Sequence, residues 1–325
     1  MREDNMANLI NENLKKKAAL VLDGAMATEL EKRGVHTDNA LWSATALIDN
    51  PEAVKAVHKS DFEAGADIAI TDTYQANVNG FEQAGYSEGQ SEKLITEAVR
   101  LARAARDEFY FELPADERAD RAPYPIVAGS VGPYGAYLAD GSEYTGDYLL
   151  TTTEFQEFHA PRMELMAKAG VDMFAFETQP NFDEAKALAA MMKTRFPNMF
   201  AWLSFSVSDP EHLCDGTPLA EAVAYFNDNP QISAIGVNCT SMNNIEATIK
   251  TIVPNTDKPI IVYPNNGDIY DPKTKTWEPN PQSATFADLT PKWLAAGAKI
   301  IGGCCRTTPG DIEQVADAVN AKNLS

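Results

Sequence analysis

Positive charge is scarce in this sequence. Its 325 residues include 27 lysines and arginines against 47 aspartates and glutamates, which gives a formal net charge of −20 at pH 7. Such a surface repels phosphate groups, so neither nucleic acid nor an anionic membrane is expected as a partner. A cationic or zwitterionic small molecule is compatible with this charge, although solubility alone also explains it.

Long apolar runs are missing too. No uninterrupted apolar segment approaches the roughly 20 residues that a membrane-spanning helix needs. The N-terminal stretch MREDNMANLINENLKKK is too polar for a signal peptide, so we expect a cytoplasmic protein. Cysteine is rare, with four residues in the chain. These are too few for a disulfide framework and should stay reduced in the cytosol.

A glycine-rich phosphate-binding loop is absent as well. The turn after the first apolar segment, DGAMATELE, has one glycine, lacks the G-x-G-x-x-G pattern, and no Walker sequence occurs elsewhere. The chain instead alternates apolar, β-branched segments with helical patterns, which is typical of βα units. The eight predicted strands are residues 19–22, 68–71, 125–128, 173–176, 200–205, 234–237, 260–263 and 299–301.

Eight strand–helix units without a second composition regime predict an α/β fold, namely a single-domain (β/α)8 TIM barrel. We expect the barrel to span residues 18–325, after a polar N-terminal extension of residues 1–17. A doubly wound open sheet is the alternative, and the missing phosphate-binding loop argues against it. Apolar residues recur at helical spacing along 94–105 and 312–319, so these segments should cover the sheet.

Three segments look inserted between the units. Residues 132–148, GPYGAYLADGSEYTGDY, and residues 267–285 follow predicted strands, so both are expected on the catalytic face of a barrel as lid candidates. Residues 113–124 precede a strand and are expected on the opposite face. Pro161 interrupts the helical pattern of residues 152–169, which predicts a kink or a break there.

Three of the four cysteines follow predicted strands. Cys239 comes after residues 234–237, and Cys304 and Cys305 come after residues 299–301. In a barrel these strand ends share one face, where three thiolates with a vacant fourth position describe a catalytic zinc site. Small buried core cysteines are one alternative, and a vicinal disulfide is another. Cys214 is interpreted as a bystander, and the four histidines show no metal-ligand spacing.

Six stretches of the sequence together resemble one family. They are LDGAMATELE (22–31), GSVGPYGAYLADGSEY (129–144), ETQPNF (177–182), GVNC (236–239), VYPN (262–265) and IGGCCRTTPGDI (301–312). In this order and spacing they resemble the zinc-dependent homocysteine S-methyltransferases, most of all the small bacterial enzymes that use S-methylmethionine. The family has a (β/α)8 barrel, in agreement with the count of strand–helix units.

The resemblance implies a metal site. The three zinc-binding cysteines of the family fall on Cys239, Cys304 and Cys305 of this sequence. With three protein thiolates around it, zinc would keep the thiol of L-homocysteine deprotonated as a fourth ligand, and therefore nucleophilic.

The resemblance also implies substrate-binding residues. Asp23 and Glu177 match the carboxylates that hold the amino-acid part of homocysteine, although an N-cap for Asp23 and a salt bridge at the barrel rim for Glu177 are alternatives. Trp42 and Tyr74 match positions near the substrate and could cover a sulfonium with their aromatic faces. Packing in the core or at the rim explains these two rings equally well.

The resulting expectation is an enzyme that transfers a methyl group from S-methylmethionine to zinc-bound homocysteine thiolate and gives methionine. S-adenosylmethionine shares the sulfonium and is a possible donor. The alternatives are betaine as donor, selenocysteine as acceptor, or a barrel that binds zinc without catalysis. Residues 132–148 are expected to act as a lid. Opposite charges cancel during the transfer, and a pocket without water favours such a reaction.

Overall fold

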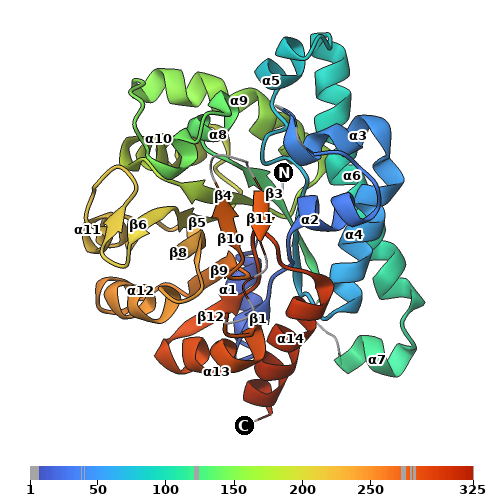
Figure 1. Cartoon of the computed structure of the whole chain (residues 1–325), viewed down its shortest axis with the longest axis vertical. Helices are drawn as coiled ribbons and strands as arrows, with labels where there is room; N and C mark the ends of the chain where they lie inside the picture. The colour runs from blue at the N-terminus through green and yellow to red at the C-terminus, as the bar shows by residue number, and fades with distance from the viewer. Residues whose placement is uncertain are drawn as a thin grey trace, which may run out of the picture.

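Eight short apolar segments form the strands of one parallel sheet. The computed structural model describes residues 7–37, 39, 41–120, 124–271, 276–278, 280 and 283–324. The strands follow the order β1-β12-β9-β8-β5-β4-β3-β2, and Figure 1 shows them at the centre with helices outside. Their bounds are β1 Leu20–Val21, β2 Ile68–Ile70, β3 Ile126–Val131, β4 Met173–Gln179, β5 Ala201–Phe205, β8 Ile232–Ser241, β9 Ile260–Asn265 and β12 Ala298–Ile301.

The two edges of this sheet meet. A parallel bridge pairs Leu22, which follows β1, with Ile68 of β2, so the sheet closes on itself. The predicted (β/α)8 TIM barrel is confirmed, and the open doubly wound sheet is wrong. Each predicted strand coincides with an observed one. Strands β3, β4, β8 and β9 run two to four residues beyond their predicted ends, because those ends carry polar residues that an apolar pattern does not mark.

Helices surround the barrel and connect successive strands (Figure 1). The longest is α6, in which the predicted apolar face is buried against the sheet. The helices are α1 Leu9–Leu14, α2 Met26–Lys32, η1 Trp42–Thr45, α3 Ala46–Asp49, α4 Pro51–Glu63, α5 Val78–Gln83, α6 Glu88–Glu112, α7 Ala115–Asp120, α8 Tyr134–Leu138, η2 Ser142–Tyr144, α9 Thr152–Ala169, α10 Phe182–Arg195, α11 Leu219–Phe226, α12 Ile245–Ile252, η3 Val253–Asn255, α13 Phe286–Ala296 and α14 Pro309–Asn323.

Two layers of apolar side chains form the core. Alternate residues of a strand point to opposite faces, so one set fills the barrel and the other packs under the helices. Leu20 and Leu22 belong to the inner cluster, whereas Val21 between them belongs to the outer one. Trp202 is the largest side chain of the inner cluster and is fully buried.

The N-terminal segment contributes to this inner layer. Helix α1 begins after Asn8, whose side chain accepts a hydrogen bond from the Asn11 amide as a helix cap. Its Ile10 is fully buried and belongs to the inner cluster. The described part of the predicted extension, residues 7–17, therefore contributes apolar side chains to the core, and α1 packs on the barrel.

The inserted segments differ in structure. Residues 132–148 contain α8 and η2. Residues 267–285 contain a hairpin of two short antiparallel strands, β10 Ile269–Asp271 and β11 Thr276–Glu278. A second antiparallel pair, β6 Val207–Asp209 and β7 His212–Leu213, follows β5. Part of the predicted connector 113–124 forms α7, and residues 121–123 lie outside the described part of the chain.

Helix α9 runs without a break through Pro161, contrary to the break allowed by the sequence. Proline removes the hydrogen bond to the carbonyl of Glu157, four residues earlier. Both residues are exposed, so water can satisfy that carbonyl. Thr151 and Glu154 cap the helix reciprocally at its start, and the buried face on the other side holds it on the barrel.

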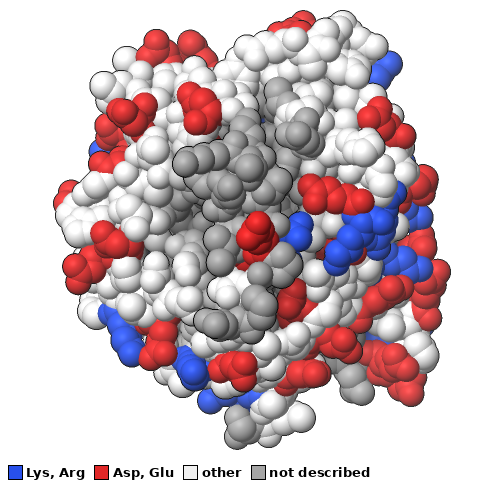
Figure 2. All heavy atoms as spheres, in the orientation of Figure 1, with Lys and Arg blue, Asp and Glu red and all other residues white. Residues whose placement is uncertain are grey.

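The outer surface reflects the net charge. Figure 2 shows acidic side chains spread around the visible face and basic side chains in fewer groups. Among the described residues, none of the helices combines the length and the apolar character that a membrane span requires.

Protonation of His58 should weaken the fold in mild acid. His58 in α4 is fully buried, and neither ring nitrogen has a hydrogen-bond partner among the described residues. Burial lowers the pKa of His58 to about 4, against an ordinary value of about 6.5. Between these values only the unfolded chain binds the proton, so the free energy of unfolding falls as the pH falls.

Urea unfolding at several pH values tests this with a His58→Leu variant, which cannot titrate. From about pH 6.5 down to about pH 4, the wild type should lose up to about 3 kcal/mol more than the variant. Parallel pH profiles of the two proteins would contradict the assignment.

Candidate metal centre

Three sulfur atoms converge at the C-terminal rim of the barrel. The sulfurs of Cys239, Cys304 and Cys305 all lie within 4.8 Å of one another. Those of Cys239 and Cys305 are 3.5 Å apart. None of the four cysteines is in a disulfide, so the vicinal disulfide is not formed. The rim thus holds a cluster that could bind a metal ion.

The chain after β12 reaches this position because Gly302 lacks a side chain. A Cβ atom on Gly302 would lie 2.6 Å from Leu22 Cβ and 2.8 Å from the Asp23 carbonyl oxygen. Gly303 N donates to that carbonyl at 3.0 Å, and Cys304 N donates to the Pro264 carbonyl at 2.8 Å. The close approach of the backbones fixes the two adjacent cysteines against the ends of β1 and β9.

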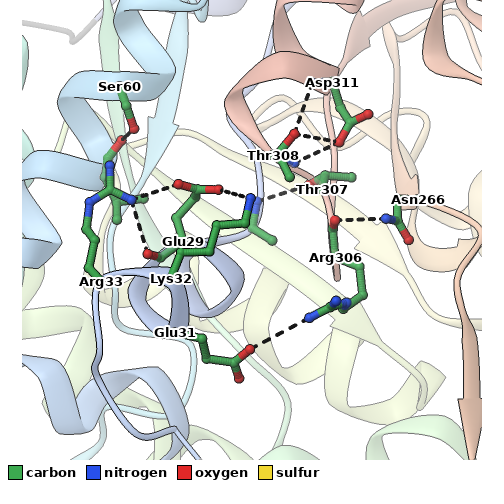
Figure 3. A network of polar contacts seen from close by, with 12 residues as sticks. Glu29, Glu31, Lys32, Arg33, Ser60, Asn266, Arg306, Thr307, Thr308 and Asp311 are labelled. Atoms are coloured by element: carbon green, nitrogen blue, oxygen red, sulfur yellow. Dashed lines mark hydrogen bonds and ion pairs between the residues drawn. The ribbon is translucent and has the colours of Figure 1, made fainter. Parts of the chain in front are cut away.

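A turn after the cysteines is held by polar contacts, which Figure 3 shows in part. Arg306 has a positive φ of 67°, a strained conformation for a residue other than glycine. Its Nε pairs with Asp268 at 3.2 Å, and its Nη1 pairs with Glu31 at 3.7 Å. Asn266 Nδ2 donates a hydrogen bond to the backbone carbonyl of Arg306 at 2.9 Å. Residues from helix α2 and from the loop after β9 therefore stabilise the turn that carries Cys305.

A bulge aims Cys239 at the other two sulfurs. The register of β8 against β9 shifts between Asn238 and Ser241, and Cys239 has a positive φ of 50°. Bulges re-aim side chains next to functional sites. The buried Asn238 side chain fixes the position, because it accepts from Thr178 N at 2.7 Å and from Ser204 Oγ at 2.8 Å.

The cluster needs a cation once its thiols lose their protons. Hydrogen bonds from Cys304 and Cys305 lower the pKa of Cys239 below its ordinary range. The same contacts with Cys239 raise the pKa of both neighbouring thiols. One negative charge is therefore tolerated and further ionisation is opposed, which a bound metal ion would reverse.

Asp23 lies at the same rim, directly after β1. It is buried, and its Oδ2 accepts from Ile70 N at 2.6 Å. The cap of α2 is Ala25, so the N-cap alternative for Asp23 is wrong. Burial and the nearby charge of Asp61 raise the pKa of Asp23. Asp61 in α4 is itself buried, and its Oδ1 has no hydrogen-bond partner among the described residues. No motif in the sequence marked it.

Glu177 occupies the equivalent place in β4. It is buried and accepts a hydrogen bond from Ser130 Oγ. Among the described residues Glu177 forms no ion pair, so the predicted alternative of a salt bridge at the rim finds no support there. Burial raises the pKa of Glu177 to about 7, and the charge of Cys239 also raises it. Two buried carboxyl groups thus lie at the rim. Neither forms an ion pair among the described residues, although the charge of Arg162 lowers the pKa of Glu177.

Trp42 and Tyr74 come together above this rim. Their ring centroids are 6.0 Å apart in an edge-to-face arrangement, and both residues are partly exposed. Trp42 has a positive φ of 49°. The next residue, Ser43, donates to the buried Asp72 at 2.5 Å. That bond fixes η1 to the segment that carries Tyr74.

The segment 132–148 contributes a residue that sequence reasoning missed. Tyr144 Oη lies 3.3 Å from the sulfur of Cys239, and the side chain is about half exposed. The predicted lid segment therefore touches the sulfur cluster. Glu143 beside it has a buried oxygen without a partner in the described structure.

Cys214 stays apart from the cluster. Its sulfur donates to Ser206 Oγ at 3.3 Å. Among the described residues, the cluster contains no histidine. The structure brings the three rim cysteines together, and places Asp23, Glu177, Trp42 and Tyr74 on the loops and strand ends around the same rim.

Comparison with known proteins gives consistent matches. A family model described as homocysteine S-methyltransferase matches residues 20–319. The homocysteine S-methyltransferase of Escherichia coli (strain K12) is 49% identical over 306 residues, which cover 94% of this chain and 96% of that protein. The homocysteine S-methyltransferase YbgG of Bacillus subtilis (strain 168) is 47% identical over 297 residues, covering 91% and 93%. The crystal structure of the homocysteine methyltransferase MmuM from Escherichia coli, metallated form, aligns with a TM-score of 0.84 and 45% identity over 95% of this chain and 99% of that chain.

Removal of any one sulfur of the cluster should abolish metal binding. We expect the purified wild type to carry about one metal ion per chain and the variants Cys239→Ala, Cys304→Ala and Cys305→Ala to carry less than about a tenth of that. Elemental analysis of each protein measures this. Cys214→Ala is the matched control and should keep the metal. Unchanged metal content in Cys239→Ala and Cys304→Ala would refute the site.

Proposed function

Because this chain belongs to the homocysteine S-methyltransferase family, we propose that it transfers a methyl group from S-methylmethionine to the sulfur of L-homocysteine and so produces methionine. We propose residues 18–325 as the homocysteine-binding barrel. The observation that carries the proposal is the cluster of Cys239, Cys304 and Cys305 at a rim that also holds two buried carboxyl groups.

Zinc is the metal that we propose for the cluster. Tetrahedral zinc with thiolates at about 2.3 Å places sulfur atoms roughly 3.8 Å apart. The observed 3.5 Å between Cys239 and Cys305, and the 4.8 Å limit for all three sulfurs, are compatible with this spacing. When bound, zinc would supply a positive charge that keeps the homocysteine sulfur deprotonated and nucleophilic.

Asp23 and Glu177 are proposed to hold the ammonium group of homocysteine. Both carboxyl groups are buried, and burial raises the pKa of each. An ammonium placed between them would favour their ionised forms. This use explains why two acidic side chains lie next to a cluster of sulfurs that is itself electron-rich.

Trp42 and Tyr74 are proposed to receive the methyl donor. A sulfonium is attracted to the face of an aromatic ring by about 0.5 to 2 kcal/mol. The homocysteine sulfur then attacks the methyl carbon, the bond from that carbon to the sulfonium breaks, and the electron pair stays on the departing sulfur. The donor leaves as neutral methionine, so the chain needs no acid group for this step.

The segment 132–148 is proposed to exclude water during transfer. Attack of a thiolate on a sulfonium cancels opposite charges, so a dry site favours the reaction. The contact between Tyr144 and Cys239 places this segment against the sulfur cluster. Residues 267–285 are the other candidate cover, and the described part of their hairpin follows β9.

The alternative donors and acceptors differ in the chemical groups that the rim would have to bind. S-adenosylmethionine has the same sulfonium and is the nearest alternative donor. Betaine has a quaternary nitrogen instead, and selenocysteine would replace homocysteine as acceptor. A barrel that binds zinc without catalysis would have no use for Asp23 and Glu177 as ammonium ligands, and these two residues favour the enzyme.

A donor comparison tests the proposed reaction. With homocysteine as acceptor, methionine formation should be fastest with S-methylmethionine and measurable with S-adenosylmethionine, whereas betaine should give none. Mass spectrometry with a labelled methyl group follows the transfer. The proposal fails if the metal-loaded protein forms no methionine with any of the three donors.

Glu177→Gln and Asp23→Asn should weaken homocysteine binding. Loss of one charged contact to the ammonium predicts an increase in the KM for homocysteine of about 10- to 100-fold, while the KM for the donor and the metal content stay close to wild type. Glu164→Gln, at an exposed site on α9, is the matched control. Equal changes in both KM values would contradict the assigned role.

A further inference from the structure

Three polar side chains form a buried chain beside the lid segment. Arg162 and His159 lie in α9 and Glu184 lies in α10, and each is at most 1% exposed. Arg162 Nη2 contacts His159 Nδ1 at 2.9 Å, and His159 Nε2 contacts Glu184 at 2.7 Å. These three residues are the Arg162 chain. None of them touches the sulfur cluster in the described contacts.

The protons in this chain have only one arrangement. Arginine has donors and no acceptor, so Nδ1 of His159 must accept from Arg162. The proton of His159 therefore lies on Nε2 and is donated to Glu184. Burial lowers the pKa of His159, which keeps the ring neutral. A neutral imidazole thus connects a buried positive charge to a buried negative charge.

The positive end of the chain holds three backbone carbonyls of the rim. Arg162 Nη1 donates to the carbonyls of Thr73 and Tyr74 at 3.2 and 2.9 Å, and Nη2 donates to the carbonyl of Gly132 at 2.8 Å. Thr73 and Tyr74 follow β2, and Gly132 follows β3. One guanidinium therefore joins the segment that carries Tyr74 to the start of the lid segment.

The negative end holds the lid segment at two further points. Glu184 Oε1 accepts from Tyr134 N at 2.7 Å, and Oε2 accepts from Tyr148 Oη at 2.5 Å. Gly132, Tyr134 and Tyr148 are at the two ends of the segment 132–148. Both of its ends are thus fixed to α9 and α10, while Tyr144 in its middle reaches Cys239.

We propose that Arg162 is a positioning residue for the methyl donor. It holds the backbone of Tyr74 and of Gly132 directly, and through His159 and Glu184 it supports both ends of the segment 132–148. The proposal rests on the proposed function, in which Tyr74 receives the sulfonium. Arg162 makes contacts on the donor side of the rim. The homocysteine side, built from Asp23, Glu177 and the cysteines, makes no hydrogen bond to Arg162 among the described contacts. The charge of Arg162 does lower the pKa of Glu177, and a lysine at this position would keep that charge.

Arg162→Lys is the direct test, because lysine keeps the charge but lacks the planar fork that reaches three carbonyls. The KM for S-methylmethionine should rise at least about tenfold, since a displaced donor loses its aligned position. Metal content by elemental analysis and homocysteine affinity by titration calorimetry without donor should stay within about twofold of wild type.

Arg106→Lys is the matched control. Arg106 in α6 is also buried. It pairs at 2.9 Å with Asp172, which directly precedes β4 and so lies at the opposite end of the barrel. This variant should lose stability without a selective change in the donor KM. Tyr148→Phe is the milder second variant and removes one hydrogen bond to Glu184; it should raise the donor KM about threefold and carries the test if Arg162→Lys does not fold.

Several results would overturn the proposal. They are an unchanged donor KM in both Arg162→Lys and Tyr148→Phe, an equal rise in both KM values, or a loss of metal from Arg162→Lys. Failure of the proposed function can be distinguished from failure of the positioning role, because the wild type itself would then transfer no methyl group. A rise in the donor KM alone supports the positioning role.

Discussion

Three sulfur atoms at the barrel rim lie close enough to repel one another once their protons leave, and the surrounding structure is arranged around that constraint. The cluster exists because a closed parallel barrel brings the ends of β8 and β12 to one face. Gly302 allows the last strand to approach β1, and a bulge turns Cys239 inward. A cation is then the condition under which all three sulfurs can ionise together.

The polar residues around the cluster divide into two sides. Asp23 and Glu177 are buried carboxyl groups at strand ends, and we propose that they hold a positively charged substrate group. On the other side, the aromatic pair of Trp42 and Tyr74 is connected to the buried Arg162 chain. This division fits a reaction between an amino-acid thiol and a sulfonium, in which each substrate brings a positive charge into an acidic site.

The sequence predicted the barrel because each strand is built on a short apolar segment that a helical pattern follows. It predicted the three cysteines because all of them follow these apolar segments. It did not predict Tyr144, Asp61 or the Arg162 chain. Their contacts depend on how distant loops and helices meet, which no local pattern encodes. The break that the sequence allowed at Pro161 does not occur for a related reason, because the cost of a proline inside a helix depends on whether the carbonyl of Glu157 can reach water. The roles of Asp23, Glu177, Trp42 and Tyr74 came from family resemblance and stay predictions.

X-ray absorption at the zinc K-edge, with and without homocysteine, tests the central claim most directly. The account predicts zinc with three sulfur neighbours at about 2.3 Å in the resting protein and four after homocysteine is added. A protein that purifies without zinc, or whose zinc keeps the same three sulfur neighbours in the presence of saturating homocysteine, would contradict it.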